Sequence, residues 1–387
     1  MDSSNSEGVD APVSVIDKNT SVTSLQDGIA LCLSGGGYRA MIFHLGALIR
    51  LNEIGLLQKL SRVSSVSGGS ITAAQLGVQW QSLKFNNGIA TNLTQLVIDP
   101  VRVLGGITID VKAVLGGLIT PGVSPSDNVA SAYRKNLYKD ATLQNLPDDR
   151  HGPRFVINAT NVQSGALWRF SRPYMGDYKV GRVINPNILI AKAVAASSAF
   201  PPVLSPSVIE LKQPFFAEPT TTLQRPPFTT EVVLTDGGVY DNLGLETAWK
   251  RYKTILVSDG GGKMAPEPQP KRDWARHAFR INNIIDNQVR SLRKRQLIEA
   301  FKLGTDHNGA YWGIRSHLKD FPVSIALDCP EPRTHELAET PTRLQSLPSQ
   351  YQNRLINWGY AVCAAATENH FPRSTGVRIQ FPYPNGV

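Results

Sequence analysis

Cysteine is scarce in this chain, and the sequence also lacks the patterns of a membrane-spanning, secreted or calcium-binding protein. The 387 residues include three cysteines, Cys32, Cys329 and Cys363, whose spacing fits neither a metal site nor an even disulfide framework. No apolar run reaches the roughly 18–20 residues that a membrane-spanning helix needs, and the first eight residues lack the basic start and apolar stretch of a signal peptide. No Asp-x-Asp-x-Asp-Gly calcium loop occurs. We therefore expect reduced thiols, no metal or other cofactor, and a cytoplasmic location.

Positive charge, in contrast, is in excess and is unevenly spread. The net charge is +9, and between Lys271 and Lys302 nine Lys/Arg stand against three acidic residues. Isoleucine, valine and leucine recur there at helical spacing, which predicts an amphipathic basic helix over 270–302. Two interpretations stay open: peripheral contact with anionic lipid headgroups, or a solvated outer face packed on the sheet. No nucleic-acid-binding motif accompanies the charge, so a nucleic-acid partner is not expected.

The most informative stretch of the sequence holds a serine at a predicted strand–turn–helix corner. Residues 62–70, Arg-Val-Ser-Ser-Val-Ser-Gly-Gly-Ser, indicate a short buried strand that turns abruptly into a helix at Ser67. Such a turn holds the hydroxyl outward and points the first amides of the helix at it. The usual pattern is Gly-x-Ser-x-Gly; Gly69 supplies its second glycine, whereas Ser65 stands at the first position. Alone, this pattern also fits an ordinary turn.

Two glycine turns would supply what an activated serine needs. An apolar strand over 28–33 is followed by Gly35, Gly36 and Gly37, which expose consecutive backbone N–H groups before a long apolar helix. A nucleophilic serine requires such donors for the oxyanion of its tetrahedral intermediate. A third apolar strand ends at Asp236, just before two glycines, and delivers a carboxylate. Oxyanion donors, nucleophile and carboxylate are each predicted at a strand end.

These blocks resemble the signature blocks of the patatin-like phospholipase family. The resemblance is carried by residues 34–40 (Ser-Gly-Gly-Gly-Tyr-Arg-Ala), 66–69 (Val-Ser-Gly-Gly) and 236–238 (Asp-Gly-Gly), with further matches at 155–161 and 195–202. The glycine block is also similar to that of cytosolic phospholipase A2 relatives. The family resemblance implies an α/β fold, a three-layer sandwich whose mostly parallel central sheet has helices on both faces. It also implies a metal-independent serine–aspartate dyad that hydrolyses fatty acyl esters of phospholipids or glycerolipids.

Carried over to this sequence, the resemblance assigns a role to each site residue. The roles are nucleophile for Ser67, base for Asp236, oxyanion hole for Gly35, Gly36 and Gly37, elbow support for Gly69, and contact with a substrate phosphate for Arg39. A surface role for Arg39 without a ligand stays open. A ligand-gated effector and a catalytically quiet lipid-binding module on the same scaffold are the alternatives in function.

Other residues compete for these roles. Asp259 also follows an apolar strand and precedes glycines, but only the Asp236 block continues in the family pattern Gly-Gly-Val-Tyr-Asp-Asn-Leu-Gly. A histidine-containing triad in the order Ser…Asp…His would draw on one of the five histidines that follow Asp236: His277, His307, His317, His335 or His370. His44, in the first helix, is expected to be a core or supporting residue. A dinucleotide site is disfavoured, because the second strand ends in serines instead of an acidic residue.

The chain is predicted to form one domain with additions. Residues 1–25 are polar and predicted to be a mobile tail, and residues 26–387 form the hydrolase domain. Residues 81–125 interrupt the strand–helix alternation with short apolar pieces, which fits either a lid-like insertion or a pair of packing helices. Residues 303–387 are expected to pack on the domain as a C-terminal extension.

Overall fold

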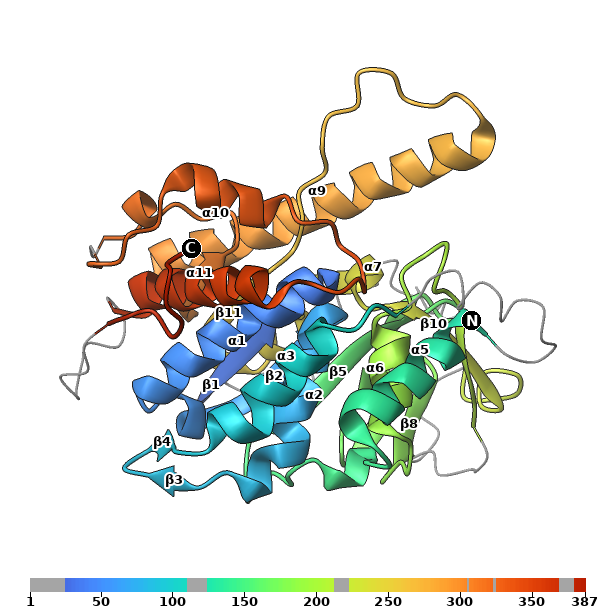
Figure 1. The fold of residues 1–387 in the computed structure, drawn as a ribbon. Helices are drawn as coiled ribbons and strands as arrows, with labels where there is room; N and C mark the ends of the chain where they lie inside the picture. Colours follow the sequence, from blue (N-terminus) through green and yellow to red (C-terminus); the bar gives the residue numbers. More distant parts are fainter. Residues whose placement is uncertain (1–24, 110–123, 212–222, 305, 323–324, 369–378) are drawn as a thin grey trace.

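A ten-stranded sheet forms the centre of the computed structural model, which describes residues 25–109, 124–211, 223–304, 306–322, 325–368 and 379–387 (Figure 1). Its strands run in the order β12-β11-β1-β2-β5-β6-β7-β8, with β10 paired to β5 and β9 paired to β10. The strands are β1 (Gln26–Leu33), β2 (Leu60–Val66), β5 (Arg154–Asn161), β6 (Ala166–Phe170), β7 (Tyr174–Asp177), β8 (Gly181–Ile184), β9 (Ser207–Glu210), β10 (Glu231–Asp236), β11 (Tyr252–Asp259) and β12 (Asn308–Gly313).

The half of the sheet that carries the glycine block and the serine block is parallel. Strands β12, β11, β1, β2 and β5 are parallel neighbours, whereas β6 to β10 join by antiparallel pairing. Because parallel strands present their carboxyl ends at one edge, the turns after β1 and β2 emerge side by side. The same edge receives the end of β10, where Asp236 pairs with Ala159 of β5.

Helices cover both faces of this sheet. Successive side chains of a strand point to opposite faces, and apolar side chains on both faces have to be buried. Leu31 and Leu33 of β1 belong to the large core that includes α1 (Gly37–Glu53), α2 (Gly68–Gln79) and α11 (Ser349–Glu368). Ala30 and Cys32 point the other way, into a smaller core with α8 (Glu246–Trp249) and Leu297 of α9 (Trp274–Leu303). The predicted three-layer α/β fold is therefore confirmed.

The C-terminal part of the chain is built into this domain. Strand β12 extends the sheet next to β11, and α11 lies along α1 (Figure 1). The two helix backbones approach so closely that a Cβ at Gly46 would be 2.0 Å from the Ile356 carbonyl oxygen, and one at Gly359 would be 2.0 Å from that of Phe43. Glycine at both positions is what lets the outer helix pack on α1.

The described part of the predicted insertion packs into the core. After the short hairpin of β3 (Phe85–Asn86) and β4 (Ile89–Ala90), a π-helical turn (Thr94–Ile98) leads into α3 (Asp99–Gly105). Val97, Ile98, Val101 and Leu104 are fully buried there, which favours packing helices over a lid for this part. Residues 110–123 and the predicted tail up to residue 24 lie outside the described residues. No helix in the described ranges combines the length and apolarity needed to cross a membrane.

Candidate active site

Ser67 occupies a strained corner between β2 and α2. Its backbone has φ 50° and ψ −120°, a conformation that costs a non-glycine residue on the order of 1–3 kcal/mol and is typical of functional turns. The two glycines that follow are required by close backbone contacts. A Cβ at Gly68 would be 2.1 Å from the Gly37 carbonyl oxygen, and one at Gly69 would be 2.4 Å from that of Leu33. The elbow support predicted for Gly69 therefore has a steric cause.

A chain of buried hydroxyl groups lies beneath this corner. The Ser67 N–H donates to Ser197 Oγ at 2.9 Å, and Ser197 Oγ donates to the Asn158 carbonyl oxygen at 2.6 Å. Ser70 Oγ lies 2.9 Å from Ser197 Oγ and 3.1 Å from Ser65 Oγ. The serine that replaces the usual first glycine thus belongs to a hydrogen-bonded network that holds the corner.

Asp236 lies at the end of β10 and is 2% exposed. Its Oδ1 accepts the Gly238 N–H at 2.6 Å, while its buried Oδ2 has no hydrogen-bond partner of standard geometry among the described residues. Burial raises the pKa of Asp236 to about 7, and the Gly238 N–H and the nearby Ser67 hydroxyl oppose that rise only in part. A carboxylate with this pKa and a free oxygen beside a serine is suited to accept a proton near neutral pH.

The segment after α6 (Ile190–Ser197) joins the serine turn to the aspartate turn. Besides binding the Ser67 N–H, Ser197 accepts the Gly237 N–H at its carbonyl oxygen, at 3.2 Å. The Ala199 carbonyl oxygen accepts the Asp236 N–H at 3.0 Å. Ser67 and Asp236, 169 positions apart in the sequence, are therefore held in register by three consecutive residues.

The glycine block lies directly beside the serine. A Cβ at Gly35 would be 3.1 Å from Ser67 Cβ, so this loop and the corner are in contact. The Gly35 N–H, however, donates to the Asn242 carbonyl oxygen at 3.0 Å and is not available as an oxyanion donor, which corrects the predicted set of three. Gly36 and Gly37 have positive φ values of 146° and 60°, and neither N–H meets an acceptor within the described ranges.

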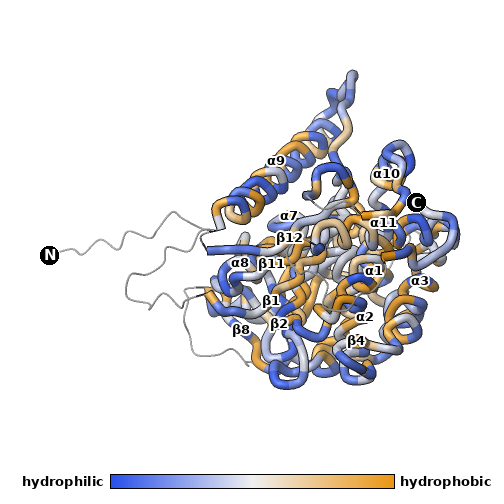
Figure 2. Tube along the Cα trace, turned by 90° about the vertical axis from the view of Figure 1, so that its left-hand side faces the viewer, coloured by the Kyte–Doolittle hydropathy of each residue, from blue (hydrophilic) through white to orange (hydrophobic). Residues whose placement is uncertain are grey.

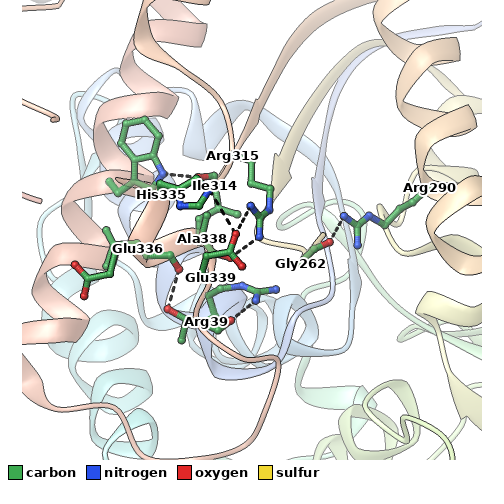
Figure 3. A network of polar contacts seen from close by, with 12 residues as sticks. Arg39, Gly262, Arg290, Ile314, Arg315, His335, Glu336, Ala338 and Glu339 are labelled. Atoms are coloured by element: carbon green, nitrogen blue, oxygen red, sulfur yellow. Dashed lines mark hydrogen bonds and ion pairs between the residues drawn. The ribbon is translucent and has the colours of Figure 1, made fainter. Parts of the chain in front are cut away.

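Arg39 is buried and its guanidinium is bound within the protein, which does not support the phosphate-binding role predicted for it. The side chain is 3% exposed. Its guanidinium donates to the Gly260 carbonyl oxygen at 3.0 Å, to the Thr342 hydroxyl at 3.0 Å and to the Thr340 carbonyl oxygen. Figure 3 shows Arg39 among these polar contacts, with Arg290 bound to Gly262 close by. Arg39 therefore ties the glycine loop to two other loops, and it is not a surface residue.

Asp259, the rival for the base, is fully engaged. Its Oδ1 accepts the Gly261 N–H at 2.9 Å and its Oδ2 accepts the Tyr311 hydroxyl at 2.8 Å. Burial would raise the pKa of Asp259, but the charge of Arg290 and these hydrogen bonds outweigh burial and lower it. This carboxylate stays ionised and has no free oxygen to accept a proton.

No described histidine is placed to complete a triad. Burial lowers the pKa of His44 to about 4, and its ring bridges Ser258 Oγ at 2.8 Å and the Ser34 carbonyl oxygen at 3.0 Å, as expected of a supporting residue. The later histidines that are described contact residues away from Ser67: His277 meets Lys271, His307 meets Tyr252, His317 meets Glu331 and His335 meets Glu339. His370 lies outside the described residues.

Asn242 is a site residue that sequence patterns alone did not single out. A Cβ would be 2.4 Å from Asn242 Oδ1 at Gly35 and 2.6 Å from it at Gly238, and 3.1 Å from Asn242 Nδ2 at Gly261. One amide side chain thus fills the space between three glycine turns. The sequence feature that could have indicated Asn242 is its position within the Asp236 block.

Over the part of the chain that is described, no group of three or more His, Cys, Asp or Glu side chains is arranged to hold a metal ion.

Comparison with known families agrees with this arrangement. The family model for patatin-like phospholipase matches residues 31–249, more than half of the chain, and includes the serine, the glycine block and Asp236. The chain belongs to the patatin-like phospholipase family. No curated protein matches it significantly.

A solved structure places this patatin-like protein in the same fold. Human GIVD cytosolic phospholipase A2, in complex with methyl gamma-linolenyl fluorophosphonate, aligns with a TM-score of 0.52 and 13% identity over 89% of this chain. VipD from Legionella pneumophila aligns with a TM-score of 0.39 and 17% identity, over 89% of this chain and 67% of its own. The chain spans 58% of the human structure, and at such identity the likeness concerns the fold.

Proposed function

We propose that this protein hydrolyses fatty acyl esters of phospholipids or glycerolipids with Ser67 as nucleophile and Asp236 as base. One observation carries the proposal: the strained serine corner lies beside a buried aspartate whose Oδ2 has no hydrogen bond of standard geometry among the described residues and whose pKa is raised to about 7. A serine hydroxyl is a weak nucleophile until a base takes its proton, and a carboxylate of this basicity can do so directly.

The proposed reaction runs through an acyl-enzyme. Asp236 Oδ2 takes the proton as Ser67 Oγ bonds to the ester carbonyl carbon, and the N–H groups of Gly36 and Gly37 stabilise the oxyanion. The intermediate collapses to an acyl ester of Ser67, and the departing alkoxide takes the proton from Asp236. Water then attacks the acyl ester, again losing a proton to Asp236, and the fatty acid leaves as Ser67 regains its hydrogen. No step requires a metal ion.

The substrate class rests on the family and the solved neighbours. The family name specifies phospholipid as substrate, and the human structure holds a fluorophosphonate with a linolenyl chain. Because such lipids reside in membranes, the proposal includes peripheral contact of a cytoplasmic protein with a lipid surface.

Hydrolysis of a short-chain nitrophenyl ester and of phospholipid vesicles, both with chelator present, tests the proposal. Ser67→Ala and Asp236→Asn are each expected to lower turnover by about 10⁴-fold, the scale seen when one member of a catalytic unit is removed. Ser131→Ala, an exposed serine on α5 (Pro125–Tyr133), is the matched control and is expected to keep native turnover. Native turnover in Ser67→Ala would show that the nucleophile is another residue.

A gated enzyme is the second candidate, and one observation favours it. Ser67 is 8% exposed, so little of its surface is open to an ester. The gated enzyme would be favoured if the unmodified protein is inactive on both substrates but becomes active when a cell extract is added. Inactivity under every condition, with vesicle binding retained, would favour the quiet lipid-binding module.

A further inference from the structure

The long helix α9 is only partly attached to the rest of the molecule. It runs for thirty residues, about 45 Å at 1.5 Å per residue, and Leu297 is its one buried residue. Its N-terminal half and the loop before it project from the body (Figure 1), and apolar residues recur along its length (Figure 2). Because so little of its surface is covered, packing in the core does not explain the apolar residues of this helix.

Contacts on one side fix which face of α9 points inward. Leu297 packs into the smaller core, Arg290 donates to the Gly262 carbonyl oxygen, and Arg293 donates to Glu246 at 3.1 Å. Nearer the N-terminus, Arg280 donates to the Ala265 carbonyl oxygen at 2.8 Å and holds the loop before the helix. The orientation of the helix about its own axis is therefore set by polar anchors and one buried leucine.

The opposite face carries a continuous apolar stripe. Trp274 is 85% exposed, Ile281 42%, Ile285 55% and Leu292 56%. Their spacings of seven, four and seven residues place all four side chains on one side of the helix, over about 27 Å of its length. The other five tryptophans lie outside this stripe and are buried or half-buried.

Charge beside the stripe indicates what covers it. Helix α9 contains seven Lys/Arg and two acidic residues. Arg295, three residues after Leu292 and hence beside it on the surface, is exposed, as is Lys302, and neither forms an ion pair with a described carboxylate. An apolar stripe flanked by cationic side chains is complementary to an anionic lipid surface, where headgroups meet the cations and acyl chains meet the stripe.

We infer that α9 lies flat on an anionic lipid surface with Trp274, Ile281, Ile285 and Leu292 inserted at the boundary between headgroups and acyl chains. The inference deepens the proposed function, on which it rests, by naming the surface through which the enzyme meets its substrate. The inner face of the same helix binds Gly262, three residues beyond Asp259 at the end of β11, so the docked helix contacts the loop at one carboxyl end of the parallel strands.

The inference is tested on the full chain with vesicles of ether-linked lipids, which contain no ester to hydrolyse. Vesicles of phosphatidylcholine with about a third phosphatidylglycerol are compared with phosphatidylcholine alone by flotation and by tryptophan fluorescence. We expect binding to the anionic vesicles with a blue shift that Trp274→Phe removes, because Trp274 is the exposed tryptophan. Raising the salt from about 0.1 M to 0.5 M should weaken binding about tenfold or more.

A double variant, Ile285→Asp with Leu292→Asp, is expected to lower vesicle binding at least ~tenfold. The matched control is Val103→Asp with Val162→Asp, whose side chains are 63% and 58% exposed on other elements and whose replacement should leave binding unchanged. Equal binding to both vesicle types, or equal loss in the two double variants, would overturn the inference.

Two further readouts distinguish lipid docking from self-association and from catalysis. If the α9 double variant converts a dimer to a monomer in sedimentation while vesicle binding persists, the stripe covers a second copy of the chain and the inference is wrong. Soluble-ester hydrolysis by the unmodified protein is measured separately. An inactive protein that binds anionic vesicles contradicts only the proposed function, whereas an active protein that does not bind them contradicts only the docking surface.

Discussion

Asp236 and Asp259 are alike in sequence and opposite in chemistry. Each ends an apolar strand, precedes glycines and is at least nine-tenths buried. Asp259 binds the Gly261 N–H and the Tyr311 hydroxyl and faces Arg290, and its pKa is lowered. Asp236 binds the Gly238 N–H, no cation of the described ranges acts on it, and its pKa is raised to about 7.

The difference shows that partners, not burial, decide which of these two buried carboxylates is suited to act as a base. Desolvation is the largest contribution for both aspartates and raises the pKa of each. What distinguishes them is Arg290, delivered by α9 from a distant part of the chain. The carboxylate without a cation is the one whose affinity for a proton is kept high enough for catalysis.

Replacing each aspartate with asparagine should move stability in opposite directions. A raised pKa means that ionised Asp236 costs stability increasingly as pH rises from about 4 to about 7. Asp236→Asn should therefore stabilise the fold by roughly 4 kcal/mol at pH 8, since one pKa unit corresponds to about 1.4 kcal/mol, and by little at pH 4. A lowered pKa means that Asp259 contributes stability above its unfolded pKa and loses it in acid, so Asp259→Asn should destabilise at pH 8 by about 2 kcal/mol.

Urea unfolding of both variants at pH 4 and pH 8 measures this contrast. Arg290→Met is the control, since it removes the cation beside Asp259 and should make that residue behave like Asp236, with stability falling as pH rises. Parallel pH dependences for the two asparagine variants would show that the aspartates do not differ as described.

Ser197 tests how the dyad is held, with a smaller expected effect. Ser197→Ala removes the acceptor of the Ser67 N–H but touches neither reacting oxygen. We expect kcat to fall about tenfold with KM unchanged, because the corner loses its fixed position while substrate contacts remain. Ser197→Thr keeps the hydroxyl and should restore most of kcat. A loss confined to thermal stability would mean that Ser197 supports the fold alone.

Local patterns were enough to predict the three strands that end at the candidate site, the elbow and the dyad candidates. The Ser67 corner and the end of β10 follow from short runs of apolar residues and glycines, and the preference for Asp236 over Asp259 came from the family pattern. Long-range contacts were not predictable. The occupied Gly35 N–H depends on Asn242, and the burial of Arg39 depends on Thr340 and Thr342.

The role of the insertion could not be decided from the sequence for a related reason. Short apolar pieces broken by proline and glycine fit a mobile lid or small packing helices equally well. What decides is whether another element covers them, and Gln75 of α2 donates to the Leu96 carbonyl oxygen at 2.8 Å within such a contact. The periodicity of apolar residues shows which face of a helix or strand is apolar. The residues that bury this face lie elsewhere in the chain.

The smallest expected effect concerns Asp286. Its charge acts from α9 on Asp236, as the charge of Arg290 acts from the same helix on Asp259. Asp286 is half-buried on the inner face of α9, and its negative charge contributes to the raised pKa of Asp236. Activity should rise with pH through about 7 as Asp236 loses its proton. Asp286→Asn removes the repulsion and should shift this rise in kcat/KM to lower pH, with little change in the plateau. Glu299→Gln, the other acid of α9, is exposed and serves as the control. A shift of equal size in both variants would mean that α9 acts on the site only through its net charge.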